Sequence, residues 1–189
     1  MPDIYDELLA PEGMVSARAI LVGKYPWFFH TARLRNFSSI QASGLEPRRP
    51  DGYIGDPPHQ VVHRIRHRAD HILCLWPVGA TDVHITSDEP LFQVALDSSA
   101  LPVRLGLDWS FPYNWNLATI VKNDFPHWET AQVFANVAHR SGSVATYDAV
   151  PAANLLVRPN GAEGWDPTGW PNLRDVAIAD IEVIPPTVP

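Results

Sequence analysis

The chain has 189 residues, of which 46% are hydrophobic and 19% are charged, so it can bury a substantial core. Its 14 Lys and Arg residues stand against 21 Asp and Glu residues. The resulting net charge of −7 excludes a general role in coating nucleic acids, because such a surface repels a phosphate backbone. The length predicts one compact domain over residues 1–189.

The N-terminal stretch MPDIYDELLAPEG predicts neither export nor membrane insertion. It begins with acidic residues and lacks the basic region and long apolar stretch of a signal peptide. No apolar run of the chain reaches the length of a membrane span. The single cysteine, Cys74, lies in the apolar run ILCLW and cannot form a disulfide within the chain. We therefore expect a cytoplasmic protein without a membrane partner.

The apolar spacing changes along the chain between helical steps and short β-branched runs, which predicts an α+β fold. In chain order, an aromatic strand end at residues 27–30 precedes a short helix over residues 33–43. Apolar residues recur there at every third position, and Gly44 can follow the last turn. A second helical pattern covers residues 127–138. Runs of strand length occupy residues 72–76, 91–96, 143–147 and 176–184.

The stretch HQVVHRIRHRADHI, residues 59–72, places a histidine at every fourth position. Asp56, followed by two prolines, predicts a helix start, and the histidines then lie opposite the apolar face. The first and last histidines would be about 18 Å apart along such a helix, so one metal ion cannot bind all four, and we predict no metal site. Three arginines, Arg64, Arg66 and Arg68, flank the apolar face, where each either binds an anion or pairs with an acidic residue.

Another histidine lies in WFFHTARLRNFSSIQASGLEP, residues 27–47. We expect His30 at a junction between a strand and a helix. A side chain at such a junction can point into a cleft, and the free amides of the helix can bind a phosphate. The alternative is a histidine with a purely structural role.

The order of residues in this block resembles the ADP-ribosyltransferase superfamily, in particular its DarT-like nucleic-acid ADP-ribosyltransferases, and more remotely the RNA 2′-phosphotransferases. The looser part of the resemblance continues through an Ile-Gly turn, an arginine-bearing helix, the LCLWP strand and SVATYDAVPAANLLV, and reaches residue 157. It implies a split β-sheet core with short helices. The positions that match residue by residue are His30, Asn36, Ser39, Ile40, Gly44 and Leu45.

The resemblance also implies roles for single residues around NAD, the substrate that supplies ADP-ribose. His30 would hold a ribose, with Thr31, Asn36 and Gly44 also at the cofactor. Arg64 or Arg68 would bind the phosphates. The family uses a glutamate on the late strand at the reacting ribose. The candidates for this acid are Asp148 and Glu129, because Ser143 stands at the glutamate's expected position.

The segment LDWSFPYNWN, residues 107–116, gathers aromatic residues into a predicted loop. Aromatic rings in a loop either stack on a nicotinamide, an adenine or a target base, or form a small satellite core. Tyr113 could bond to a ribose or an amide. The motifs of Rossmann and P-loop nucleotide sites and of hydrolase nucleophile elbows are absent from the sequence.

Together these features lead us to expect an NAD-dependent ADP-ribosyltransferase, a toxin- or defence-like transferase whose acceptor is a nucleic acid or a protein. One alternative is a catalytically inactive module that binds NAD or ADP-ribose. Another is an RNA 2′-phosphotransferase-like enzyme, which the presence of only two lysines, Lys24 and Lys122, disfavours.

Overall fold

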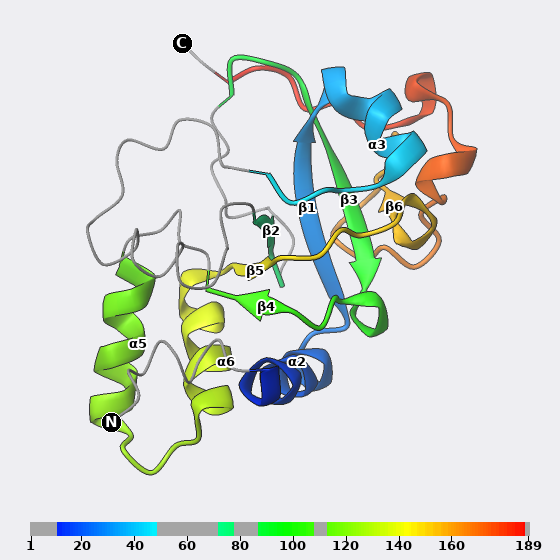
Figure 1. Ribbon diagram of the computed structural model, residues 1–189. Helices are drawn as coiled ribbons and strands as arrows, with labels where there is room; N and C mark the ends of the chain where they lie inside the picture. The colour runs from blue at the N-terminus through cyan, green and yellow to red at the C-terminus, as the bar shows by residue number, and fades with distance from the viewer. Residues whose placement is uncertain (1–10, 49–71, 78–86, 108–112, 188–189) are drawn as a thin grey trace. The chain divides into compact units, whose positions relative to one another are not determined.

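The computed structural model describes residues 11–48, 72–77, 87–107 and 113–187 (Figure 1). The chain divides into two compact units. Unit 1 contains residues 1–24, 46–75 and 102–149, and unit 2 contains residues 25–45, 76–101 and 150–189. Each unit combines helix with a three-stranded antiparallel sheet. The α+β prediction is therefore confirmed, while the single domain expected over residues 1–189 stays a prediction.

The sheet of unit 2 has the strand order β1-β3-β6. These strands are β1 (Trp27–Arg33), β3 (Leu91–Asp97) and β6 (Leu156–Val157). β3 lies in the centre, and all of its residues except Asp97 are buried. A strand covered on both faces reads as a nearly continuous apolar run, which is why LFQVAL, interrupted only by Gln93, predicts a strand without the usual alternation.

The core of unit 2 lies on both faces of this sheet. On one face, Phe29 meets Trp165 and Trp170 edge to face, with ring centroids 5.7 and 6.3 Å apart. The other face is covered by helix α3 (Phe37–Ser43), whose Phe37 ring lies 5.3 Å from that of Phe92. The helix predicted over residues 33–43 is thus confirmed, with a short 3-10 turn, η1 (Leu34–Asn36), as its first part.

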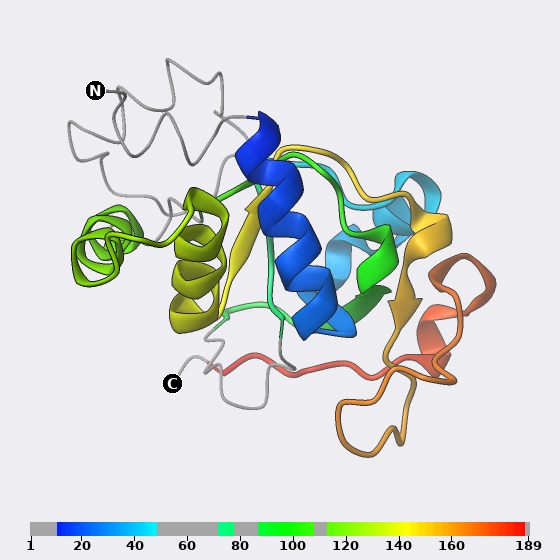
Figure 2. The ribbon, with the colours of Figure 1, turned by 90° about the horizontal axis from the view of Figure 1, so that it is seen from below.

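The C-terminal segment corrects one prediction. Residues 176–184 do not form the expected strand, and Figure 2 shows the chain after β6, drawn in orange and red, as loops and short turns. A 3-10 turn, η6 (Ile178–Asp180), interrupts the segment. Beyond it, Ile181 pairs with Pro159 while Ile184 pairs with Leu91. Because these single pairings go to different partners, no continuous ladder forms.

Unit 1 contains a second small sheet, with the strand order β2-β5-β4, and three of the described helices. Every residue of the central strand β5 is buried. The elements of the unit are α2 (Pro11–Lys24), β2 (Leu73–Leu75), β4 (Leu105–Gly106), α5 (Tyr113–Asp124), α6 (Thr130–Ser141) and β5 (Val144–Thr146). The strands predicted at residues 72–76 and 143–147 are confirmed.

Helix α6 packs against both α2 and α5. It buries an apolar stripe that includes Val133, Phe134 and Val137, and it ends at Gly142 in the left-handed conformation, with φ 73°. The helical pattern at residues 127–138 is thereby confirmed, with a later start. Helices α2 and α5 were not predicted. No helix in the described residues has both the length and the hydropathy needed to span a bilayer.

Candidate functional site

Strand β1 pairs with β3 along one of its two edges, and its outer edge faces away from β3. Leu34 N–H donates to the Pro90 carbonyl at 2.8 Å, so even-numbered residues direct their main-chain groups toward β3. Odd-numbered residues face the outer edge, where Phe29 exchanges hydrogen bonds of 2.8 and 2.9 Å with Trp76. Thr31, two residues further, therefore presents its N–H and C=O at this outer edge. No described residue pairs with it there.

His30 lies within β1, opposite Val94, rather than at the junction with the helix as expected, because β1 continues to Arg33. Its half-buried imidazole is nearly parallel to the Trp76 indole, with ring centroids 6.1 Å apart and an interplanar angle of 12°. The candidate histidine thus has an aromatic neighbour that the same strand holds in place.

Thr31 follows His30 in the strand, so the two side chains point to opposite faces of the sheet. The Thr31 hydroxyl oxygen is buried and has no hydrogen-bond partner among the described residues. Gln93, its partner in the register, is only 5% exposed. A ligand beside the His30 imidazole can therefore contact the main chain of Thr31 at the edge, but not its hydroxyl.

Asn36 and Gly44 flank helix α3. Asn36 ends η1, and its carbonyl accepts a hydrogen bond of 3.0 Å from the Ser39 hydroxyl. Gly44 adopts φ 87° and ψ −165°, and its N–H donates to the Ile40 carbonyl at 2.8 Å. A Cβ atom on Gly44 would lie 2.7 Å from the Ala152 nitrogen. The structure therefore gives Gly44 a packing role.

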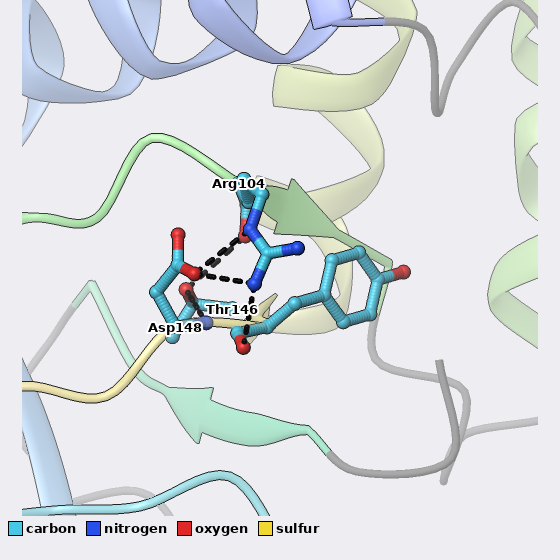
Figure 3. A network of polar contacts seen from close by, with 4 residues as sticks. Arg104, Thr146 and Asp148 are labelled. Carbon is cyan, nitrogen blue, oxygen red and sulfur yellow. Dashed lines mark hydrogen bonds and ion pairs between the residues drawn. The ribbon is translucent and has the colours of Figure 1, made fainter. Parts of the chain in front are cut away.

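Asp148, the first candidate acid, belongs to unit 1 and forms an ion pair with Arg104 (Figure 3). Arg104 Nε donates to Asp148 Oδ1 at 2.8 Å, and a terminal nitrogen of Arg104 lies 2.6 Å from the same oxygen in the ion pair. This carboxylate raises the pKa of Arg104 above its usual value. The Thr146 hydroxyl accepts the Asp148 N–H at 3.1 Å and donates to the Arg104 carbonyl at 3.1 Å. In Figure 3 the second carboxylate oxygen of Asp148 points away from Arg104.

Tyr147 stands between Thr146 and Asp148 in the sequence, and its phenol ring packs against Gly106. A Cβ atom on Gly106 would lie 2.6 Å from the phenol ring carbon that carries the hydroxyl. Burial raises the pKa of Tyr147 above its usual value. The phenol therefore stays protonated at neutral pH and cannot act there as a base.

Glu129, the second candidate acid, is exposed and occupies the N-cap position of α6 with extended backbone angles. Its N–H donates to the side-chain oxygen of Gln132 at 2.9 Å. This contact is one half of a capping box, in which Glu129 and Gln132 each contact the main chain of the other. A capping box satisfies amides at the start of a helix that would otherwise lack a partner. This position gives Glu129 a structural role that the sequence reasoning missed.

Other predicted site residues lie outside the described part of the chain. These include Arg64, Arg68 and the histidines of residues 59–72. Tyr113 is the first residue of α5, and its side chain also lies outside the described part. Among the residues that the structure does describe, no three His, Cys, Asp or Glu side chains form a group that could hold a metal ion.

The predicted site residues are divided between the two units. Unit 2 contains His30, Thr31, Asn36 and Gly44, whereas unit 1 contains Asp148 and Glu129. The sequence reasoning missed Trp76 and Arg104. Each is tied to its partner by a contact between distant positions in the chain, which no local pattern reveals.

Comparison with known proteins adds no relative. No family model matches the chain, and no curated protein or solved structure matches it either.

Proposed function

We propose that the chain is an NAD-dependent ADP-ribosyltransferase that recognises NAD at the outer edge of β1 in unit 2. The supporting observation is the combination, on consecutive residues, of the His30 imidazole with the donor and acceptor of the Thr31 main chain. A primary carboxamide such as that of nicotinamide carries both an N–H donor and a C=O acceptor. It can therefore bond to Thr31 as a neighbouring strand residue would.

The reaction breaks the glycosidic bond between nicotinamide and ribose. The bonding electrons leave with nicotinamide, and an acceptor nucleophile forms the new bond to the ribose carbon and loses its proton. A carboxylate stabilises the positive charge that develops on the ribose, and correct orientation supplies much of the remaining acceleration. Of the two acids predicted from the sequence, Asp148 remains the better candidate, because Glu129 lies at a helix cap while one oxygen of Asp148 points away from its arginine.

The proposed setting is a cytoplasmic, toxin- or defence-like reaction on a nucleic acid or a protein. A protein acceptor is favoured by the net charge of −7, which repels phosphate. A nucleic-acid acceptor is favoured by the sequence block around His30. The acceptors in the test below separate these two classes.

A second candidate function is a module that binds NAD or ADP-ribose without transferring it. Two observations favour this function: Arg104 engages the Asp148 carboxylate through a hydrogen bond and an ion pair, and Glu129 is exposed at the start of α6. A protein that lacks a reacting carboxylate would keep its affinity for the dinucleotide and lose most of the rate.

The test incubates the purified protein with NAD and measures nicotinamide release, alone and with DNA, RNA or protein acceptors. His30→Ala is compared with His127→Ala, which removes an exposed histidine in unit 1. Release that is lost only in His30→Ala supports the transferase. Binding without release supports the module, and the absence of both contradicts the proposal.

A further inference from the structure

The contact between His30 and Trp76 is held from the main chain. Trp76 N–H donates to the Phe29 carbonyl at 2.9 Å, and Phe29 N–H donates to the Trp76 carbonyl at 2.8 Å. The residue that precedes His30 in β1 therefore fixes the backbone of Trp76. With both backbones fixed, the distance of 6.1 Å between the two rings depends only on their side-chain rotations.

The ring of Trp76 favours one orientation of the His30 imidazole. This imidazole is half-buried, and two single bonds set its direction. Fixing a side chain on binding costs about 0.5–1.5 kcal/mol. A ring held nearly parallel, at 12°, restricts the imidazole before the ligand arrives. Aromatic pairs at this separation contribute an interaction of similar size.

We infer that Trp76 is a positioning residue, whose indole holds the His30 imidazole in the orientation in which it meets NAD. This inference rests on the proposed function, since it assigns Trp76 a part in the same recognition. It excludes an independent contact of Trp76 with the ligand. Trp76 therefore affects NAD binding only while His30 is present.

A double-mutant cycle tests this dependence, because it separates an action through His30 from an independent one. NAD affinity is measured by calorimetry for the wild-type protein, Trp76→Leu, His30→Ala and the double variant. Leucine keeps an apolar side chain but removes the ring plane. Trp76→Met replaces it if the leucine variant does not fold, and Trp76→Phe restores a ring.

The expected loss of affinity in Trp76→Leu lies between about 2-fold and about 12-fold, from the energy of an aromatic pair. In the His30→Ala background the same substitution has no further effect, and Trp76→Phe regains most of the affinity. Trp165→Phe is the matched control, because Trp165 belongs to the same unit and contacts Phe29 edge to face at 5.7 Å. It binds NAD as the wild-type protein does.

If the losses of NAD affinity in the two single variants multiply in the double variant, the inference is overturned, because Trp76 then acts without His30. An unchanged affinity in Trp76→Leu also overturns it, as does failure of Trp76→Phe to regain affinity. Both of those results leave the proposed function intact. A wild-type protein that does not bind NAD overturns the proposed function and this inference together.

Discussion

The main chain of Gly44 lies against the carbonyl group of Val150, at a position where a side chain does not fit. Its backbone angles, φ 87° and ψ −165°, belong to a region that residues other than glycine rarely adopt. We predict that Gly44→Ala lowers the free energy of unfolding by about 2 kcal/mol or more, through backbone strain and displacement of the facing segment. Urea denaturation measures this loss.

Gly23 offers the matched control. It lies near the end of α2, and apart from its chain neighbours and its own helix backbone no atom lies within 4 Å of the position that its Cβ would take. Gly23→Ala should raise the free energy of unfolding by about 0.5–1 kcal/mol, because alanine favours the helix. Equal effects of the two substitutions would contradict the packing role of Gly44.

The prediction of this region from sequence succeeded because its signals are local. Phe37 and Ile40 follow a helical spacing, and the glycine that ends the helix stands directly after it. The strand β3 was likewise evident from its apolar run. Short-range periodicity and turn residues determine such elements, so a single sequence reveals them.

The sequence predictions that proved wrong or incomplete share a different cause. Residues 176–184 have the composition of a strand, yet their pairing depends on partners at Pro159 and Leu91, far away in the chain. Helix α5 begins inside an aromatic stretch that was expected to be a loop. For the candidate site, the strand that carries His30 could be predicted, but its contact with Trp76 could not.

Arg158 organises the loop after β6. Its side chain is 10% exposed, and its guanidinium pairs with Glu182 and donates to the carbonyls of Gly164 and Ala162. It also lies over the Trp165 ring, 4.4 Å from the centroid. We predict that Arg158→Met lowers the free energy of unfolding by about 1–3 kcal/mol, because two main-chain carbonyls and the Glu182 carboxylate lose the donor that the buried arginine supplies.

We predict that lysine at position 158 does not restore the free energy of unfolding of the wild-type protein. Arg158→Lys regains less than half of the loss, since an ammonium group lacks the planar fork that reaches three acceptors. The control is Arg174→Met, an exposed arginine in the same unit, with an expected effect within about 0.5 kcal/mol. Both are measured by urea denaturation, and full stability of Arg158→Lys would contradict the account.

Asp97 should make folding stability depend on pH. Hydrogen bonds from the Ser99 hydroxyl and from the Ser99 N–H lower the pKa of Asp97 below its ordinary 3.8. The folded state therefore favours the carboxylate, and this contribution is present above the ordinary pKa and is lost as the pH falls through the folded value. We predict that Asp97→Asn reduces the loss of stability between pH 5 and pH 2.5, by less than about 1 kcal/mol.

Denaturant midpoints across this pH range check the effect. Asp88→Asn serves as the control, because Asp88 is an exposed carboxylate of the same unit. The pH dependence of that variant should follow the wild-type protein. An identical profile for Asp97→Asn and the wild-type protein would show that the carboxylate does not contribute.

The two candidate acids should separate in a kinetic test. We predict that Asp148→Asn lowers the rate of nicotinamide release by about 100-fold or more and leaves NAD affinity nearly unchanged, because the charge acts mainly in the transition state. Glu129→Ala should leave the rate unchanged, since Glu129 lies at the start of α6. Release rates at saturating NAD, with affinities from calorimetry, measure both. A rate that falls only in Glu129→Ala would reverse the assignment.

Calorimetric titration of the wild-type protein and His30→Ala with NAD, and with its analogue bearing a carboxylate in place of the carboxamide, tests the central claim most directly. Recognition at the β1 edge predicts that the wild-type protein binds NAD and that His30→Ala loses about 10-fold or more in affinity. It also predicts weaker binding of the carboxylate analogue, which leaves the Thr31 carbonyl without a donor. Absence of NAD binding, or equal affinities in both comparisons, would contradict the claim.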